Sequence, residues 1–199
     1  MIVGLTGGIG SGKTTIANIF AQFDSVIVYN ADSEAKKIME SSSVIRSKII
    51  EVFGDKSYEN NQLNKPFISS IVFNDKIKLG KLNSIVHPEV KKHFQQFVIQ
   101  HKNKDYIVYE NAILFESKSN LICNIIISVH IPLEVRTERV MLRDKSSRLA
   151  VEARIKNQWL EGKKLLQSNY LICNIDSKKT YFRVVDIHNI LTKKIRKFN

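Results

Sequence analysis

Residues 7–14 read Gly-Gly-Ile-Gly-Ser-Gly-Lys-Thr. They satisfy the pattern G-x-x-x-x-G-K-[ST], a glycine-rich turn whose backbone N–H groups converge on a phosphate. An apolar run at residues 1–5 precedes the motif, and residues 12–23 carry apolar side chains at helical spacing. The strand before the motif and the helix after it are the context that the motif requires. We therefore predict a nucleoside triphosphate site in which Lys13 neutralises the β- and γ-phosphates and Thr14 ligates Mg²⁺.

Short, continuously apolar runs alternate along the chain with segments of helical periodicity. The strand-like runs lie at residues 1–5, 25–29, 106–109, 125–129 and 170–173. This alternation is typical of a parallel sheet covered on both faces. We predict an α/β fold with a five-stranded parallel sheet, helices over 133–166 and a closing helix over 181–194. Residues 41–104 contain no convincing strand, so we interpret them as an inserted helical region.

The composition points to an ordinary globular chain with a strong positive charge. It has 199 residues, with 31 Lys and Arg against 19 Asp and Glu, a net charge of +12. Residues 140–199 hold 14 of the cations and five of the acids, an excess that attracts nucleotides, phosphorylated cofactors or nucleic acid. For the basic tail at 193–197, a merely solvated surface is the alternative interpretation. One domain is expected, with room for an inserted subdomain.

Several classes of protein are disfavoured. No apolar run approaches the ~18 residues that a membrane span needs, and no charged leader precedes the first strand. Cys123 and Cys173 lie in apolar runs, which favours buried reduced thiols and a cytoplasmic protein over a disulfide framework. The histidines show no metal-ligand spacing.

Asp32 follows the second strand candidate. If the first two strands are neighbours, its carboxylate lies at the sheet edge where the phosphate loop lies. There it could accept the proton of a hydroxyl that attacks the γ-phosphate. The alternative is an N-cap for the helix that follows, and the two roles are compatible.

A helical segment near residue 140 is rich in arginine. Arg136, Arg139 and Arg143 are spaced i, i+3, i+7 and therefore share one helix face. Their planar guanidinium groups suit phosphate oxygens, which predicts a mobile lid over a triphosphate. The alternative is ordinary surface pairing with the acidic residues of the same segment, Glu134, Glu138 and Asp144.

With these residues assembled, the sequence resembles the dephospho-CoA kinase family. The matching segments are residues 4–15, Ala31-Asp32, Val72-Phe73, residues 82–90, Leu114-Phe115-Glu116, residues 139–144, Arg154-Ile155, Gln158 and residues 170–174. The phosphate loop alone is generic, but its combination with Leu82-Asn83-Ser84-Ile85-Val86-His87-Pro88-Glu89-Val90 is specific.

The resemblance implies ATP-dependent phosphorylation of the ribose 3′-hydroxyl of dephospho-CoA, the last step of coenzyme A biosynthesis. It implies a single P-loop kinase domain related to nucleoside-monophosphate kinases. The expected core covers about 1–55, 106–136 and 166–199, the CoA-binding insertion about 56–105 and the lid about 137–165. Expected cofactors are ATP and Mg²⁺. The expected partner is dephospho-CoA, without nucleic acid or membrane, in a monomer or weak homo-oligomer.

The resemblance also assigns site residues. The catalytic set is Lys13, Asp32, Arg139 and Arg143. The ATP-binding set is Gly8, Gly10, Ser11, Gly12, Lys13, Thr14, Thr15 and Asn174, with Thr14 as the metal ligand. The substrate-binding set is Thr6, Asp32, Asn83, His87, Leu114 and Glu116.

The chain departs from the family pattern at three places. Asn30 replaces the first residue of Asp-Ala-Asp, Asn64-Lys65 replaces Asp-Arg, and Ala112-Ile113 replaces Pro-Leu.

Two other functions stay open. Another small-molecule P-loop kinase, for a nucleoside monophosphate, shikimate or gluconate, is opposed by residues 82–90. A nucleotide-gated RNA-binding or regulatory protein has only the charge in its favour, because no known nucleic-acid motif is present.

Overall fold

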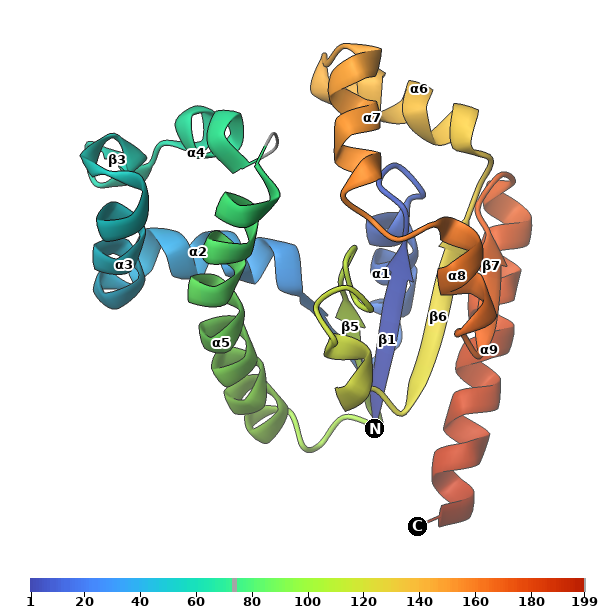
Figure 1. The fold of residues 1–199 in the computed structure, drawn as a ribbon. Helices are drawn as coiled ribbons and strands as arrows, with labels where there is room; N and C mark the ends of the chain where they lie inside the picture. The colour runs from blue at the N-terminus through green and yellow to red at the C-terminus, as the bar shows by residue number, and fades with distance from the viewer. Residues whose placement is uncertain (73–74, 199) are drawn as a thin grey trace. The chain divides into compact units, whose positions relative to one another are not determined.

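The computed structural model describes residues 1–72 and 75–198, so Phe73 of the Val72-Phe73 motif lies outside the described residues. The chain divides into two compact units (Figure 1). One comprises Met1–Asn30 with His101–Asn199, and the other comprises Ala31–Gln100.

The first unit is built on a parallel sheet. Its strands are β1 (Ile2–Gly7), β2 (Val26–Asn30), β5 (Tyr106–Glu110), β6 (Ile125–His130) and β7 (Tyr170–Cys173). Their spatial order is β2-β5-β1-β6-β7, which confirms the predicted α/β fold with a five-stranded parallel sheet. The first two strands are not neighbours, so the condition set for Asp32 is not met, because β5 pairs with both β1 and β2. Hydrophobic periodicity identifies strands but does not encode their order across the sheet.

Helices cover this sheet. They are α1 (Lys13–Phe20), α6 (Leu133–Asp144), α7 (Arg148–Lys156), α8 (Glu161–Leu166) and α9 (Ser177–Phe198), with the short turn η2 (Ser119–Ile122). Helices α1 and α9 share one hydrophobic core with the strands, to which Ile16, Phe20 and Leu191 contribute fully buried side chains. The predicted segment 133–166 is interrupted, because Lys145 adopts a left-handed conformation at the end of α6.

The second unit has its own core. Its elements are α2 (Ala31–Ser41), α3 (Ser43–Phe53), η1 (Asp55–Ser57), β3 (Tyr58–Glu59), β4 (Gln62–Leu63), α4 (Lys65–Val72) and α5 (Lys76–Gln100). The expectation of no strand between residues 41 and 104 is wrong, since β3 and β4 form a small hairpin. Asn60 and Asn61 both have positive φ at its turn, the conformation that a two-residue hairpin loop requires.

The cysteines differ in their surroundings. Both are free, Cys123 being half-buried and Cys173 exposed. Burial raises the pKa of the Cys123 thiol to about 12. The expectation of two buried thiols is wrong for Cys173, which lies on the edge strand β7.

Among the described helices, none combines the length and apolar character that a membrane crossing needs.

A histidine fastens α9 to the core. The Tyr106 hydroxyl shares a 2.8 Å hydrogen bond with Nδ1 of His188, and the imidazole stacks on Phe23 with ring centroids 3.8 Å apart. Burial lowers the pKa of His188, against a smaller opposing effect of the Asp105 carboxylate. The packing therefore favours the neutral imidazole.

This packing predicts a pH-dependent stability. Because the folded-state pKa of His188 lies below its unfolded value of about 6.5, its contribution is present above that pH and is lost as the pH falls. We expect the free energy of unfolding to fall more steeply between pH 7.5 and pH 5 in the wild type than in His188→Gln. The difference in slope is below about 1.4 kcal/mol per pH unit, the limit for one proton. Urea titrations of both proteins measure it, and equal slopes would contradict the prediction.

Candidate active site

The glycine-rich loop between β1 and α1 surrounds the Lys13 ammonium. Nζ of Lys13 donates to the carbonyl oxygens of Gly7 at 3.1 Å and Gly8 at 3.4 Å. Gly10 and Gly12 have φ of 81° and 86°, a region that side chains with a Cβ rarely adopt. The loop thus places a buried cation at the N-terminus of α1, which is favourable for an anion.

The Arg136 side chain packs against the phosphate loop at Gly8. Its side chain is 5% exposed, and a Cβ on Gly8 would overlap its guanidinium group. Its Nη2 lies 3.5 Å from Oε2 of Glu161, while its Nε has no hydrogen-bond partner among the described residues. Arg136 therefore packs against the backbone of the phosphate loop, in a role that helical periodicity did not distinguish from that of the other arginines.

Glu110, at the carboxyl end of β5, is a site residue that the sequence reasoning missed. Its Oε1 accepts a hydrogen bond from the Thr14 hydroxyl and its Oε2 accepts one from the Asn30 amide, both at 2.7 Å. The residue is 5% exposed. The available signal was an acidic residue closing an otherwise apolar strand, and its meaning depended on β5 lying beside β1.

The residues at this edge fit a divalent cation. Thr14 offers a hydroxyl and Glu110 a carboxylate, the hard oxygen ligands that Mg²⁺ prefers, and Mg²⁺ takes its remaining ligands from water and substrate phosphates. Within the described part of the chain, no group of three or more His, Cys, Asp or Glu side chains forms a metal cluster. The donor set thus suits a cation held jointly with a nucleotide.

Asn174 joins the end of β7 to the loop. Its Nδ2 donates to the Ser11 carbonyl at 2.9 Å, and a Cβ on Gly12 would overlap the same amide. The Arg139 guanidinium lies 3.4 Å from the Asn174 carbonyl oxygen. Three predicted site residues, Ser11, Arg139 and Asn174, are thus brought together, whereas Thr15 is exposed on α1.

The arginines in the last turn of α6 and on α7 form ion pairs. Arg143 and Arg154 both bind the Asp144 carboxylate, at 2.7 Å in each case, and Arg148 pairs with Glu134. The hydrogen bond from Arg143 holds the pKa of Asp144 below its usual value. The surface pairing considered as an alternative to the lid is therefore present, and the catalytic role of Arg143 stays a prediction.

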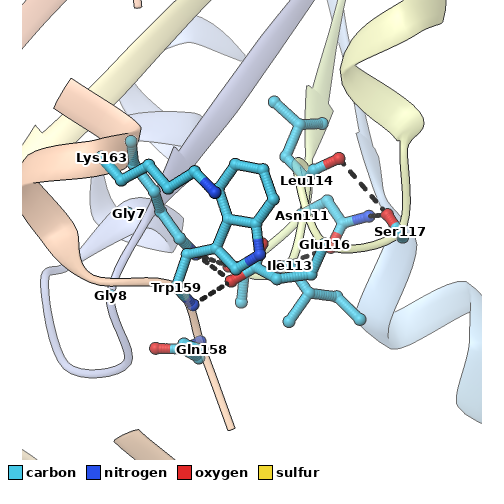
Figure 2. A network of polar contacts seen from close by, with 12 residues as sticks. Gly7, Gly8, Asn111, Ile113, Leu114, Glu116, Ser117, Gln158, Trp159 and Lys163 are labelled. Atoms are coloured by element: carbon cyan, nitrogen blue, oxygen red, sulfur yellow. Dashed lines mark hydrogen bonds and ion pairs between the residues drawn. The ribbon is translucent and has the colours of Figure 1, made fainter. Parts of the chain in front are cut away.

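The predicted substrate residues of the first unit are mostly buried. Thr6 and Leu114 are fully buried, and the Thr6 hydroxyl has no hydrogen-bond partner among the described residues. Oε1 of Glu116 accepts a 2.7 Å hydrogen bond from the Trp159 backbone N–H (Figure 2) and lies 2.7 Å from Nζ of Lys164. Glu116 is thus engaged with other parts of its own unit.

The second unit brings Asp32 close to His87. Asp32 lies in the first turn of α2, which begins at Ala31, so it is inside the helix and not the capping residue before it. Burial lowers the pKa of His87, and the Asp32 carboxylate partly opposes this. Asn83 lies four residues before His87 on α5, on the same helix face.

The sheet order, the phosphate loop with Lys13 and the Thr14–Glu110 pair define a P-loop nucleotide-binding protein of the α/β class. The family model for dephospho-CoA kinase matches residues 1–179. The chain therefore belongs to the dephospho-CoA kinase family and is a kinase, an enzyme of the transferase class.

Individual relatives agree with this assignment. The chain is 32% identical over 193 residues to a dephospho-CoA kinase of Bacteroides fragilis strain YCH46, covering 97% of this chain and 94% of the relative. Its fold matches the crystal structure of TT1252 from Thermus thermophilus, with a TM-score of 0.84, 27% identity and 96% of each chain covered. It also matches a dephospho-CoA kinase from Campylobacter jejuni, with a TM-score of 0.70, 26% identity and coverage of 97% and 98%.

The position of Glu110 predicts a metal-dependent effect of its replacement. Glu110→Gln preserves the shape of the side chain but removes the negative charge beside Thr14. We expect the Mg²⁺ concentration that half-saturates ATP binding to rise about tenfold or more, as for other residues that support a metal site. Titration of Mg²⁺ in an ATP-binding assay measures this. Glu51→Gln, an exposed change on α3, is the control, and an unchanged Mg²⁺ requirement for Glu110→Gln would contradict the prediction.

Proposed function

We propose that this chain transfers the γ-phosphate of ATP to the ribose 3′-hydroxyl of dephospho-CoA, giving CoA and ADP. The observation that carries the proposal is the family match over residues 1–179. The loop around Lys13 and the Thr14–Glu110 pair support the use of a nucleotide with a divalent cation. Residues 82–90 and the family match both disfavour a different small-molecule kinase.

The residues of the loop bind and orient the nucleotide. Lys13 and the N-terminus of α1 neutralise charge on the β- and γ-phosphates. Thr14 and Glu110 would hold Mg²⁺, which when bound neutralises the developing charge of the phosphoryl group. Arg136 keeps the loop backbone in place from the side of Gly8.

Asp32 is the proposed general base for the acceptor hydroxyl. It follows the end of β2 by two residues, and the last residue of β2, Asn30, donates to Glu110. Consecutive Cα atoms are about 3.8 Å apart, so chain connectivity keeps the Asp32 backbone near this edge of the sheet. His87, which burial keeps mostly neutral, and Asn83 would orient the same substrate.

Arg139 and Arg143 are proposed to stabilise the transferring phosphoryl group. In this arrangement Arg143 exchanges the Asp144 carboxylate for phosphate oxygens, which its planar fork fits equally well. Asn174 is proposed to lie beside the bound purine. We further propose a cytoplasmic enzyme that works as a monomer or weak homo-oligomer and has no nucleic-acid partner.

A coupled assay of ADP release tests the function. Dephospho-CoA is offered with ATP and Mg²⁺, and adenosine, AMP and pantetheine serve as alternative acceptors. Of these four acceptors, we expect only dephospho-CoA to be phosphorylated. Efficient turnover with AMP, or none with dephospho-CoA, would refute the proposal.

The proposed role of Asp32 as general base predicts that its replacement lowers the rate of phosphoryl transfer without weakening ATP binding. Asp32→Asn removes the proton acceptor but is nearly isosteric, so we expect turnover to fall by at least about 10² while ATP affinity is retained. Steady-state kinetics and equilibrium binding of ATP separate the two effects. Glu34→Gln, in the same helical turn, is the control. Turnover within a few-fold of the wild type would limit Asp32 to stabilising α2.

The proposed role of Arg143 predicts a similar loss. Arg143→Ala removes one positioned cation, and we expect kcat to fall by about 10² or more, the scale of one lost electrostatic donor. Arg183→Ala, an exposed change on α9, is the matched control. A change in kcat of less than about threefold would show that Arg143 serves only its ion pair with Asp144.

A further inference from the structure

The connection between α7 and α8 contacts the phosphate loop through a hydrogen bond to Ile9. Two consecutive residues of this connection, Gln158 and Trp159, make hydrogen bonds to distant parts of the chain. Oε1 of Gln158 accepts a 2.9 Å hydrogen bond from the Ile9 backbone N–H. The Trp159 N–H donates to Oε1 of Glu116 at 2.7 Å (Figure 2). The position of Gln158 therefore determines which way the Ile9 peptide faces.

Lys164 holds the carboxylate that anchors this connection. Its Nζ lies 2.7 Å from Oε1 of Glu116 and donates to the Ala112 carbonyl at 2.8 Å. Its side chain is 2% exposed. Burial lowers the pKa of Lys164, and the hydrogen bond with Glu116 opposes this. A single carboxylate oxygen thus joins the buried ammonium to the Trp159 backbone.

Aromatic packing keeps the same segment in one place. The Trp159 ring stacks on Phe115 with centroids 5.8 Å apart and nearly parallel planes. Nζ of Lys163 lies 3.7 Å from the centre of the indole, and Figure 2 shows its side chain alongside the ring. These contacts leave the indole half-buried and do not fix the backbone N–H, which is fixed by Glu116.

A buried ion pair is weak grounds for stability, because desolvation of both charges offsets their attraction. A well-packed apolar pair would fill the same space. The charged pair adds a fixed orientation of the Glu116 carboxylate, because one of its oxygens must face both the Lys164 ammonium and the Trp159 N–H. The loop it serves is one whose backbone N–H groups must be oriented before the phosphates arrive.

We propose that Lys164 is a positioning residue, which acts through Glu116 and the Trp159 backbone to hold Gln158 against Ile9 and so sets the phosphate-binding conformation of the loop. The inference rests on the proposed function only in its use of ATP as the ligand. It does not depend on the identity of the phosphate acceptor.

A double-mutant cycle tests the proposed route. Lys164→Met removes the ammonium while keeping an unbranched side chain, and Gln158→Leu removes the acceptor of the Ile9 N–H. The dissociation constant of ATP with Mg²⁺ is measured for both single variants and for the double variant by equilibrium dialysis. We expect each single change to weaken binding about tenfold, the value of one positioned hydrogen bond. If Lys164 acts through Gln158, the double variant binds no more weakly than the weaker single variant.

Two results would overturn the inference. One is an ATP affinity of Lys164→Met within about twofold of the wild type, and the other is additive effects of about a hundredfold in the double variant. Lys178→Met, an exposed lysine on α9, controls for the loss of one charge. Urea unfolding confirms that every variant is folded in the assay. If Lys164→Met does not fold, Glu116→Met replaces it in the cycle, because it removes the oxygen that joins Lys164 to the Trp159 N–H.

The chain's only tryptophan gives an independent reading. Release of the connection exposes the indole, so the emission of Trp159 should shift to longer wavelength in Lys164→Met and not in Lys178→Met. Unchanged emission in Lys164→Met would also overturn the inference. A wild type that binds ATP but does not phosphorylate dephospho-CoA refutes the proposed function alone, and the cycle still decides the role of Lys164.

Discussion

The carboxylate of Glu110 is the interaction on which the site depends. Its two oxygens accept hydrogen bonds from the Thr14 hydroxyl at the start of α1 and from the Asn30 amide at the end of β2. It therefore fixes the phosphate loop to the strand that leads into the second unit. Asn30 also explains one departure from the family pattern. An aspartate there would place a second carboxylate against a buried one, and like charges at that distance repel strongly, whereas the amide supplies a hydrogen bond.

The local parts of this structure were predictable because their causes are local. The loop needs glycine where φ is positive, and an apolar run of five residues is enough to mark a buried strand. All five strand candidates are strands, and the closing helix is present as part of α9. The family resemblance extended this to the activity, because residues 82–90 added a second, independent motif to the loop.

The rest depends on contacts between distant residues, which a single sequence does not encode. The placement of β5 between β1 and β2 makes Glu110 a neighbour of Thr14, ninety-six residues away. Arg136 and Arg143 share a helix face by spacing, yet Arg136 is buried against Gly8 and Arg143 is exposed. The difference comes from position along α6: Arg136 and Val140 lie against Gly8 and Gly10 of the loop, whereas Arg143 lies in the last turn of the helix. The hairpin at Asn60 and Asn61 was missed because its strands have two residues each.

The sheet topology also sets the order in which the protein can form. Strand β1 is central, and it pairs with β5 and β6, whose register places Ile2 opposite Ile107 and Val3 opposite Ile125. During synthesis, β1 therefore stays unpaired until β5 has been made, about a hundred residues later. Helix α9 closes the core later still. Contacts this distant in sequence slow folding, and an unpaired apolar strand is a template for aggregation. In the finished sheet that exposure is gone, because β1 is paired on both sides.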